Sequence, residues 1–390
     1  MNTALKILLV EDSETDADLL VRFLHKEKIN FSHSRVWNRN DFVSALKEND
    51  HDLIIADHSL PQFSGMEAFH IAKNENRKIP FILVTGTVTE NILAEYAKEG
   101  VDDYILKENL LRLPSAIENV VSKKKIEHLL EKLETAHKDI KDSINYAKRI
   151  QNAMLPDTAL LSDSFPKSFI LYKPKDVLSG DFYWFKKEGS TSFISAVDCT
   201  GHGVPGALMS MIGIEKLNNA VAKTKEPSEI LKQLNKSIEI ALCQSTHYEH
   251  SQDGMDIALC AIDKENRILK FSGANRQLWI IRHGQTELEE IRGTKKAIGG
   301  LTMGIDPDFE SHEIKLEQGD TFYIFSDGYA DQFGGDQKQK LFTKRFKELL
   351  LSIQDQTMQE QGKYLNNFIE EWKSGDEQVD DILVIGVRQE

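Results

Sequence analysis

The chain has 390 residues and a formal net charge of −14, because 62 Asp and Glu residues outnumber 48 Lys and Arg residues. Its length fits two or three domains, and its excess of acid excludes nucleic acid as the main partner, because phosphates require a basic face. No apolar run approaches the roughly 20 residues of a membrane span, so we expect no membrane contact. Cys199, Cys243 and Cys260 have no disulfide-framework spacing, which favours reduced thiols in the cytoplasm.

The first 120 residues alternate between short apolar runs and amphipathic segments. Strands are predicted at residues 4–10, 31–36, 51–57, 81–84 and 103–106, and helices at 15–26, 41–48, 66–74, 92–99 and from 110 onward. This alternation predicts an α/β fold with a parallel, doubly wound sheet. Ligands of such sheets lie at the carboxyl ends of the strands.

Those strand ends carry a specific order of polar residues: Glu11 and Asp12, then Asp57, Thr85 and Lys107. Three carboxylates bind a hard cation, and the cation neutralises an incoming phosphoryl group. A hydroxyl and an ammonium can then contact that phosphoryl group. This arrangement resembles a two-component response-regulator receiver domain over residues 1–120.

The receiver resemblance implies a role for each of these residues. Asp57 is then the phosphoacceptor, Thr85 binds the phosphoryl group, Lys107 pairs with it, and Tyr104 is the aromatic switch residue. The implied Mg²⁺ site consists of Glu11, Asp12, Asp57 and the backbone carbonyl of Ser59. The implied source of the phosphoryl group is a sensor histidine kinase or a small phosphodonor. Glu108 departs from the family, which usually has proline at this position.

Residues 115–155 contain neither glycine nor proline, and Pro114 and Pro156 bracket them. A helix here could extend roughly 60 Å at 1.5 Å per residue. Apolar residues recur every seven positions, at Ile126, Leu133, Ile140, Ala147 and Met154. This spacing favours a coiled coil that joins two chains in a homodimer. A single helix folded back on its own C-terminal domain is the alternative. We assign residues 121–160 as this linker and residues 161–390 as the domain that follows.

The C-terminal region repeatedly places an acid at the edge of an apolar run. Asp181 precedes one such run, Asp198 ends a predicted strand, Asp327 follows another, and Asp380 and Asp381 open the last. If these strands lie side by side, the acids converge at one end of a sheet. Clustered carboxylates repel one another unless cations bind, so this pattern predicts a two-metal site that activates water.

Two competing interpretations of the Asp198 region fail. Gly201-His-Gly203-Val-Pro-Gly206 matches the G-x-G-x-x-G of dinucleotide sites, but the acid expected about 20 residues later is missing and Asp198 would repel a pyrophosphate. Cys199 does not begin the C-x5-R of cysteine phosphatases, because the sixth residue after it is Pro205. His202 is either an acid–base residue or a histidine packed or hydrogen-bonded in the turn.

The segments S-G-D-F-Y-W, A-V-D-C-T-G-H-G-V-P-G, F-S-G-A-N-R-Q-L-W, I-F-S-D-G-Y and V-D-D-I-L-V-I together resemble the SpoIIE/RsbU-type, type 2C (PPM) metal-dependent serine/threonine phosphatases over residues 165–388. The resemblance implies an α-β-β-α sandwich with two Mn²⁺ or Mg²⁺ ions between its sheets. The implied metal ligands are Asp181, Asp198, the backbone carbonyl of Cys199, Asp327 and Asp380, with Asp381 as the register alternative for the last. The implied reaction is in-line attack of metal-activated hydroxide on phosphoserine or phosphothreonine.

The sequence also departs from the phosphatase pattern. The G-H-N-P that often follows the middle hairpin is Gly273-Ala-Asn-Arg276 here. No clear counterpart of the phosphate-binding arginine of eukaryotic relatives is present, and Lys175 is either a substitute or a surface charge. Asp253 and Asp256 are predicted to be solvated turn acids rather than metal ligands.

The combined prediction is a response regulator whose receiver phosphorylation controls a protein phosphatase. By resemblance, the substrate is a phosphorylated anti-sigma-factor antagonist of the STAS type. Residues 143–155 resemble the first helix of RsbU-type phosphatases and are the candidate sensor of the receiver. One alternative is a catalytically silent scaffold that sequesters a partner, which the complete acidic motifs disfavour. Another is a nucleotide cyclase or transferase, which the missing glycine-rich triphosphate cradle disfavours.

Overall fold

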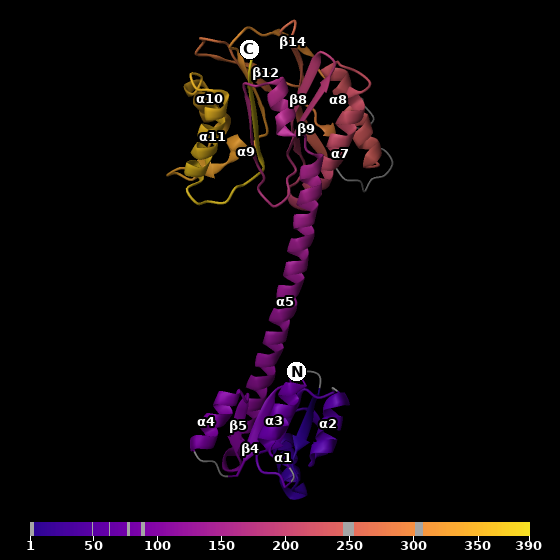
Figure 1. Ribbon diagram of the computed structural model, residues 1–390, viewed down its shortest axis with the longest axis vertical. Helices are drawn as coiled ribbons and strands as arrows, with labels where there is room; N and C mark the ends of the chain where they lie inside the picture. Colours follow the sequence, from indigo (N-terminus) through magenta and orange to yellow (C-terminus); the bar gives the residue numbers. More distant parts are fainter. Residues whose placement is uncertain are drawn as a thin grey trace. The chain divides into compact units, whose positions relative to one another are not determined.

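The computed structural model describes residues 4–48, 50–61, 63–75, 79–86, 90–244, 253–300 and 307–390, with the backbone alone at 90–93 and 95. The chain divides into two compact units, Met1–Asp139 and Ile140–Glu390 (Figure 1). The division falls within a single helix, α5 (Leu113–Met154). No helix within the described residues combines the length and the apolar character that crossing a bilayer requires.

The first unit contains a five-stranded parallel sheet in the order β2-β1-β3-β4-β5. Its strands are β1 (Leu5–Val10), β2 (Phe31–Val36), β3 (Leu53–Asp57), β4 (Phe81–Thr85) and β5 (Asp103–Leu106). Its helices are α1 (Glu14–Lys26), α2 (Arg39–Glu48), α3 (Gly65–Asn74) and α4 (Glu90–Glu99), with the 3₁₀ helix η1 (Lys107–Arg112) leading into α5. The predicted doubly wound sheet is confirmed.

Both faces of this sheet are covered, which explains why its strands are continuously apolar. In β1, Ile7 and Leu9 pack into one core cluster and Leu8 and Val10 into another on the opposite face. Because parallel strands present their carboxyl ends at one edge, Asp57 at the end of β3 comes to lie beside the residues that follow β1.

The second unit contains two antiparallel sheets, with the orders β14-β10-β9-β8-β7 and β12-β11-β15-β18-β6. The first sheet comprises β7 (Phe182–Glu188), β8 (Thr191–Cys199), β9 (Gly254–Asp263), β10 (Ile268–Ala274) and β14 (His312–Lys315), with β13 (Ile298–Gly299) paired to β9. The second comprises β6 (Ser168–Lys173), β11 (Leu278–Ile281), β12 (Leu288–Ile291), β15 (Thr321–Phe325) and β18 (Ile382–Arg388). A separate small hairpin is formed by β16 (Phe333–Gly334) and β17 (Gln339–Lys340).

Helices cover the outer face of each sheet of the second unit (Figure 1). They are α7 (Gly203–Val221) and α8 (Pro227–Ala241) on the first sheet, and α9 (Gly328–Asp331), α10 (Phe342–Ser352) and α11 (Met358–Lys373) on the second. The short helix α6 (Thr158–Ser164) instead contributes Leu161 to the core between the two sheets. One core cluster joins α7 and α8 to the first sheet, another joins α10 and α11 to the second, and a third lies between the sheets. These layers confirm the predicted α-β-β-α sandwich.

Two expectations about local structure change. The acid-bearing strands do not lie side by side in one sheet, because β7 and β8 belong to the first sheet whereas β15 and β18 belong to the second. Pro114 lies within the first turn of α5 rather than before it, where its missing N–H breaks no helical hydrogen bond. The sequence also predicts that the glycine-rich segment 294–304 is mobile, and residues 301–304 of this segment lie outside the described residues.

Candidate metal and phosphoryl sites

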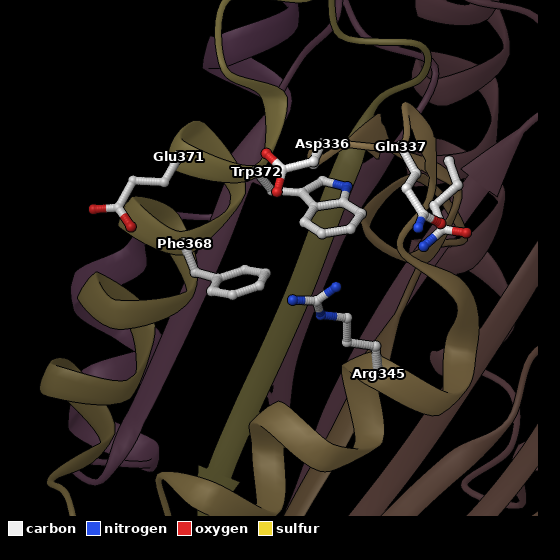
Figure 2. A pocket seen from close by; sticks show the side chains of 8 residues that line it. Asp336, Gln337, Arg345, Phe368, Glu371 and Trp372 are labelled. Atoms are coloured by element: carbon white, nitrogen blue, oxygen red, sulfur yellow. The ribbon is translucent and has the colours of Figure 1, made fainter.

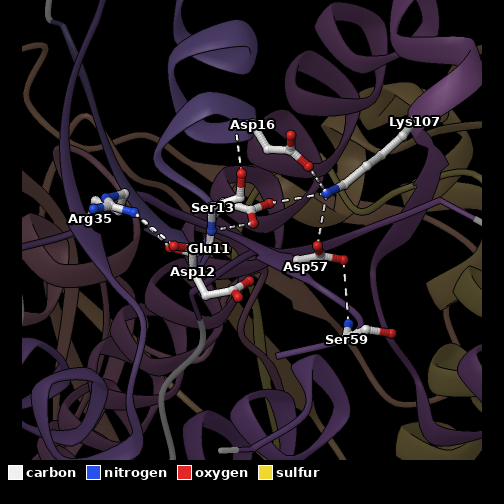
Figure 3. A network of polar contacts seen from close by, with 8 residues as sticks. All are labelled: Glu11, Asp12, Ser13, Asp16, Arg35, Asp57, Ser59 and Lys107. Atoms are coloured by element: carbon white, nitrogen blue, oxygen red, sulfur yellow. Dashed lines mark hydrogen bonds and ion pairs between the residues drawn. The ribbon is translucent and has the colours of Figure 1, made fainter. Parts of the chain in front are cut away.

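The first unit brings together three acids from the ends of β1 and β3 (Figure 3). Glu11, Asp12 and Asp57 offer carboxylate oxygens that all lie within 4.8 Å of one another. No other set of three His, Cys, Asp or Glu side chains in the described ranges meets that distance. An all-oxygen donor set fits a hard divalent cation such as Mg²⁺.

Lys107 reaches into this acidic group from the end of β5 (Figure 3). Its Nζ lies 2.8 Å from Asp57 Oδ2, 3.2 Å from Glu11 Oε2 and 2.6 Å from Asp16 Oδ2. Burial lowers the pKa of Lys107, but the hydrogen bonds to Asp16 and Asp57 and the nearby charges outweigh it, and the net shift is upward. Lys107 therefore stays charged beside Asp57. Asp16 comes from the first turn of α1, and no strand-end pattern in the sequence marks it as part of this site.

Ser59, Thr85 and Tyr104 are the other residues to which the receiver resemblance gives a role. The Ser59 amide donates to Asp57 Oδ1 at 3.3 Å, and Thr85 is buried at the end of β4. The Tyr104 ring lies 6.3 Å from the Tyr96 ring, and the Tyr96 hydroxyl is 2.5 Å from Nδ1 of His58, the residue after Asp57. A line of contacts therefore runs from Asp57 through α4 to Tyr104. Tyr96 was missed because a buried tyrosine on an amphipathic helix carries no sequence signal of its own.

The predicted phosphatase acids come from strand ends of the two facing sheets. Asp198 is the second-to-last residue of β8, and Asp181 directly precedes β7. Asp327 connects β15 to α9, and Asp380 and Asp381 precede β18. The acids thus meet across the two sheets rather than along one.

Glycines allow the segments that carry Asp181 and Asp198 to touch. A Cβ on Gly180 would lie 2.4 Å from the Gly201 carbonyl oxygen, and a Cβ on Gly206 would lie 2.3 Å from the same oxygen. Gly201 has a φ of +82°, which side-chain-bearing residues rarely adopt. The G-x-G-x-x-G pattern therefore reflects close backbone packing at the acidic site and not a dinucleotide cradle.

Arg276 lies among these acids. Its Nη2 is 2.5 Å from Asp198 Oδ2, 2.9 Å from Asp327 Oδ2 and 3.4 Å from Asp256 Oδ2. The expectation that Asp256 is a turn acid is wrong, because it lies within β9 directly opposite Asp198 and accepts a hydrogen bond from Asn275. Neither residue was assigned to the site from sequence, because the pairing of β8 with β9 is not a local property of the chain.

Burial has a strong effect on the acids. It raises the pKa of Asp181 well above its usual range, with a further contribution from the charge of Asp198. Burial also raises the pKa of Asp198, to about 7, although Arg276 opposes the shift, and it raises the pKa values of Asp256 and Asp380. Asp181 Oδ2 is buried without a hydrogen-bond partner among the described residues. A carboxylate in this setting requires a proton or a cation, so the donor set fits a divalent metal for which protons compete.

Asp380 and Asp381 have different surroundings. The Asp381 carboxylate accepts the Lys175 amide at 2.7 Å through Oδ1 and the Gly180 amide at 2.7 Å through Oδ2. It therefore anchors the loop that leads to Asp181. Asp380 Oδ1 accepts the Asp381 amide at 2.8 Å, and its carboxylate charge acts on Asp198 and Asp181.

Cys199 and His202 follow Asp198. Burial raises the pKa of the Cys199 thiol well above its usual range, which is consistent with a role through the backbone and not through sulfur. His202 is exposed and hydrogen-bonded rather than packed: its Nδ1 lies 2.6 Å from Asp176 Oδ2, and its Nε2 lies 3.2 Å from Lys175 Nζ. Lys175 thus belongs to a polar cluster beside the Asp198 turn.

Gln151, near the end of α5, contacts the loop that leads to Asp181. Its side chain is 3% exposed, and its Nε2 donates to the Ser179 carbonyl at 2.6 Å and to Ser210 Oγ at 2.9 Å. The Ser179 amide donates back to Gln151 Oε1 at 3.3 Å. Since Ser179 is two residues before Asp181, α5 holds the loop that positions this acid. A glutamine in a charged helix looks solvent-exposed in sequence, so its burial was not predicted.

We expect Gln151→Ala to raise the Mn²⁺ concentration that gives half-maximal phosphatase activity by about tenfold. This is a typical cost of removing a hydrogen bond that orients a metal ligand. The Asp181 loop would lose its anchor while the core stays intact. The measurement is the Mn²⁺ concentration that gives half-maximal hydrolysis of an aryl phosphate. Asn152→Ala, on the exposed side of the same turn, is the matched control. Equal behaviour of the two variants would show that the contact does not position Asp181.

A separate open pocket of about 480 Å³ lies near the β16–β17 hairpin (Figure 2). Figure 2 shows the Arg345 guanidinium beside two aromatic rings, with its Cζ 4.4 Å from the Trp372 ring centre and 5.9 Å from that of Phe368. None of the predicted metal acids lines this pocket.

Comparison with known families agrees with both units. The model of the family described as stage II sporulation protein E (SpoIIE) matches residues 188–390, slightly more than half of the chain. The chain belongs to the SpoIIE family. Residues 7–118 of this SpoIIE-family protein match the response regulator receiver domain, so a receiver is joined to a type 2C phosphatase domain.

Individual relatives match one unit or the other. Phosphoserine phosphatase RsbU of Bacillus subtilis is 28% identical over 198 residues, which are 50% of this chain and 55% of RsbU. Hybrid signal transduction histidine kinase G of Dictyostelium discoideum is 32% identical over 106 residues, 26% of this chain and 3% of the kinase. The solved SiaA-PP2C domain of Pseudomonas aeruginosa has a TM-score of 0.59 and 34% identity, covering 65% of this chain and 99% of that domain. The chain thus spans about half the length of RsbU and a small part of the kinase.

Proposed function

We propose that this SpoIIE-family protein is a response regulator whose output is metal-dependent hydrolysis of phosphoserine or phosphothreonine in a protein. The observation that carries the proposal is that the buried Asp181 Oδ2, beside Asp198, has no hydrogen-bond partner in the part of the chain that the structure describes. A scaffold has no need of such a costly carboxylate, whereas a metal site does. The likeness to RsbU, a phosphoserine phosphatase, supports the same reaction.

The proposed ligands of two Mn²⁺ or Mg²⁺ ions are Asp181, Asp198, the Cys199 carbonyl, Asp327 and Asp380. We assign Asp380 rather than Asp381 as the last ligand, because backbone amides already occupy both oxygens of Asp381. Bound metals would supply an activated water and positive charge against the phosphoryl oxygens. Asp381 and Gln151 keep the Asp181 loop in place, and the proposed task of His202, oriented by Asp176, is to pass a proton to the leaving oxygen.

For the receiver we propose Asp57 as the phosphoacceptor, supplied by a sensor histidine kinase or a small phosphodonor. Mg²⁺ would be held by Glu11, Asp12, Asp57 and the Ser59 carbonyl. Lys107 and Thr85 would bind the phosphoryl group, and Tyr104 would respond to it. The contacts of Lys107 with Asp57 and Glu11 support this assignment. The proposed domain extents are 1–120 for the receiver, 121–160 for the linker and 161–390 for the phosphatase.

We also propose that α5 joins two copies of the chain in a homodimer. Its heptad positions Ile126, Leu133 and Ile140 are 58%, 66% and 60% exposed, and a second α5 would cover them. Leu133→Glu is expected to convert the dimer to monomer in sedimentation-velocity runs, because a charge at this seam cannot be buried. Lys132→Glu, one residue away on the polar face, controls for charge. A wild-type protein that sediments as a monomer would contradict the dimer.

The proposed substrate is a phosphorylated STAS-type anti-sigma-factor antagonist, on the basis of the resemblance to RsbU-type phosphatases. The test begins with full-length protein, an aryl phosphate and Mn²⁺ or Mg²⁺, followed by phosphorylated antagonist proteins from the same genome. We expect phosphate release that a chelator stops. A protein inert toward both substrates with either metal would favour the silent scaffold instead.

A further inference from the structure

Close backbone packing fixes the position from which the Arg276 side chain reaches the acidic site. A Cβ on Gly273 would come within 2.3 Å of the Arg276 carbonyl oxygen, and a Cβ on Gly293 would come within 2.4 Å of it. Asn275 has a φ of +56°, and its amide donates to the Thr294 carbonyl at 2.8 Å. The backbone around Arg276 is therefore confined on both sides, and its guanidinium is directed at the acids from a fixed base.

The guanidinium contacts acids of two kinds. Asp198 and Asp327, at 2.5 Å and 2.9 Å from Nη2, are proposed metal ligands. Asp256, at 3.4 Å, is not, and it is held by the Asn275 side chain at 2.8 Å. Asp256 would therefore still be able to pair with Arg276 when a metal occupies Asp198 and Asp327. The Nε of Arg276 is also buried without a hydrogen-bond acceptor among the described residues. The guanidinium therefore does not make all the hydrogen bonds that it could donate.

We propose that Arg276 is an internal competitor of the metal ions for Asp198 and Asp327, and that Asp256 retains the guanidinium when a metal displaces it. A guanidinium and a divalent cation cannot both sit against the same carboxylate oxygens, since like charges repel at that distance. Metal loading is therefore coupled to movement of one side chain. The inference rests on the proposed metal site and adds a residue that tunes its affinity.

The competition has a consequence for the acids themselves. The Arg276 Nη2 lies within 3.4 Å of carboxylate oxygens of Asp198, Asp256 and Asp327, and its positive charge offsets their mutual repulsion. The site thus has its own counter-ion, which a divalent cation replaces. Removing the arginine should strengthen metal binding and leave the metal-stripped protein less stable, because three clustered, partly exposed acids would then repel one another.

The test is a calorimetric titration of Mn²⁺ into full-length protein without substrate. Every variant carries Asp12→Asn and Asp57→Asn, so that the receiver does not contribute a binding step. We expect Arg276→Gln to bind Mn²⁺ at least about tenfold more tightly, since an arginine beside a carboxylate shifts its proton affinity by about one to three pKa units. Thermal melts in chelator report folding and should show a lower melting temperature for Arg276→Gln. Arg282→Gln, at the other end of β11 and paired with Glu289 and Asp320, should bind Mn²⁺ like the parent.

A second variant tests the role of Asp256. Asp256→Asn removes the alternative partner of the guanidinium, so we expect weaker Mn²⁺ binding, and no such effect when Arg276→Gln is also present. If Asp256→Asn weakens binding equally in both backgrounds, Asp256 is itself a ligand and the retention role is wrong. If Arg276→Gln binds Mn²⁺ no more tightly than the parent, the competition is wrong while the phosphatase proposal stands. If no variant binds Mn²⁺, both proposals fall.

Discussion

Asp198→Asn is expected to abolish metal-dependent phosphate release, with a loss of about a thousandfold or more, because it removes a proposed ligand and the charge that holds the metal. The effect should be chemical and not structural. Burial raises the pKa of Asp198 to about 7, so the fold favours the protonated carboxyl, which asparagine copies in shape and charge.

The effect of Asp198→Asn on thermal stability distinguishes the loss of a metal ligand from the loss of the fold. A carboxyl whose pKa is higher in the folded than in the unfolded state binds its proton more tightly when folded, so its contribution to stability falls as pH rises through 7. At pH 8, chelator-treated Asp198→Asn should therefore melt no lower than wild type. Asp163→Asn, on the exposed side of α6, is the matched control and should retain activity. Retained activity in Asp198→Asn would contradict the assignment of Asp198 as a ligand.

Asp57→Ala is expected to eliminate phosphoryl uptake by the receiver. Asp57 is the acid that contacts both Lys107 and the Ser59 amide, and its carboxylate oxygen would form the bond to phosphorus. Intact-protein mass spectrometry after incubation with acetyl phosphate and Mg²⁺ should show one added phosphoryl group in wild type and none in the variant. Asp18→Ala, an exposed acid on α1, should be modified like wild type.

The same pair of proteins tests the regulatory switch. Hydrolysis of the aryl phosphate by wild type should change after phosphodonor treatment, and that of Asp57→Ala should not. Gln151 offers the physical connection, because α5 belongs to both units and its last turns hold the Asp181 loop through Ser179. Equal wild-type rates with and without phosphodonor would contradict the switch even if Asp57 is modified.

The meeting of three acids and a lysine at one edge of the parallel sheet was predictable from sequence. In a doubly wound sheet every strand delivers its carboxyl end to the same edge, so the order of residues that close the strands already describes the site. Glu11, Asp12, Asp57 and Lys107 meet for this reason. Asp16 was missed because its position depends on how the first turn of α1 lies over that edge.

The phosphatase site was predictable only in part. The acids could be recognised because each stands beside an apolar run, and that pattern is local. The sheet that each strand joins could not be predicted, because antiparallel partners such as β15 and β18 are brought together from distant parts of the chain. The prediction that the acid-bearing strands lie side by side in one sheet was therefore wrong, although the acids still meet across the sandwich.

By itself, the sequence determined the fold classes, the order of the elements and the residue types able to bind metal and phosphoryl groups, because periodicity, turn chemistry and strand-end acids act over short distances. Only the tertiary structure decided that Asp256 faces Asp198, that Arg276 reaches three of the acids, and that Gln151 is buried against the Asp181 loop. These contacts join residues far apart in the chain. Their energies depend on burial and on neighbouring charges, which exist only once the sheets have packed.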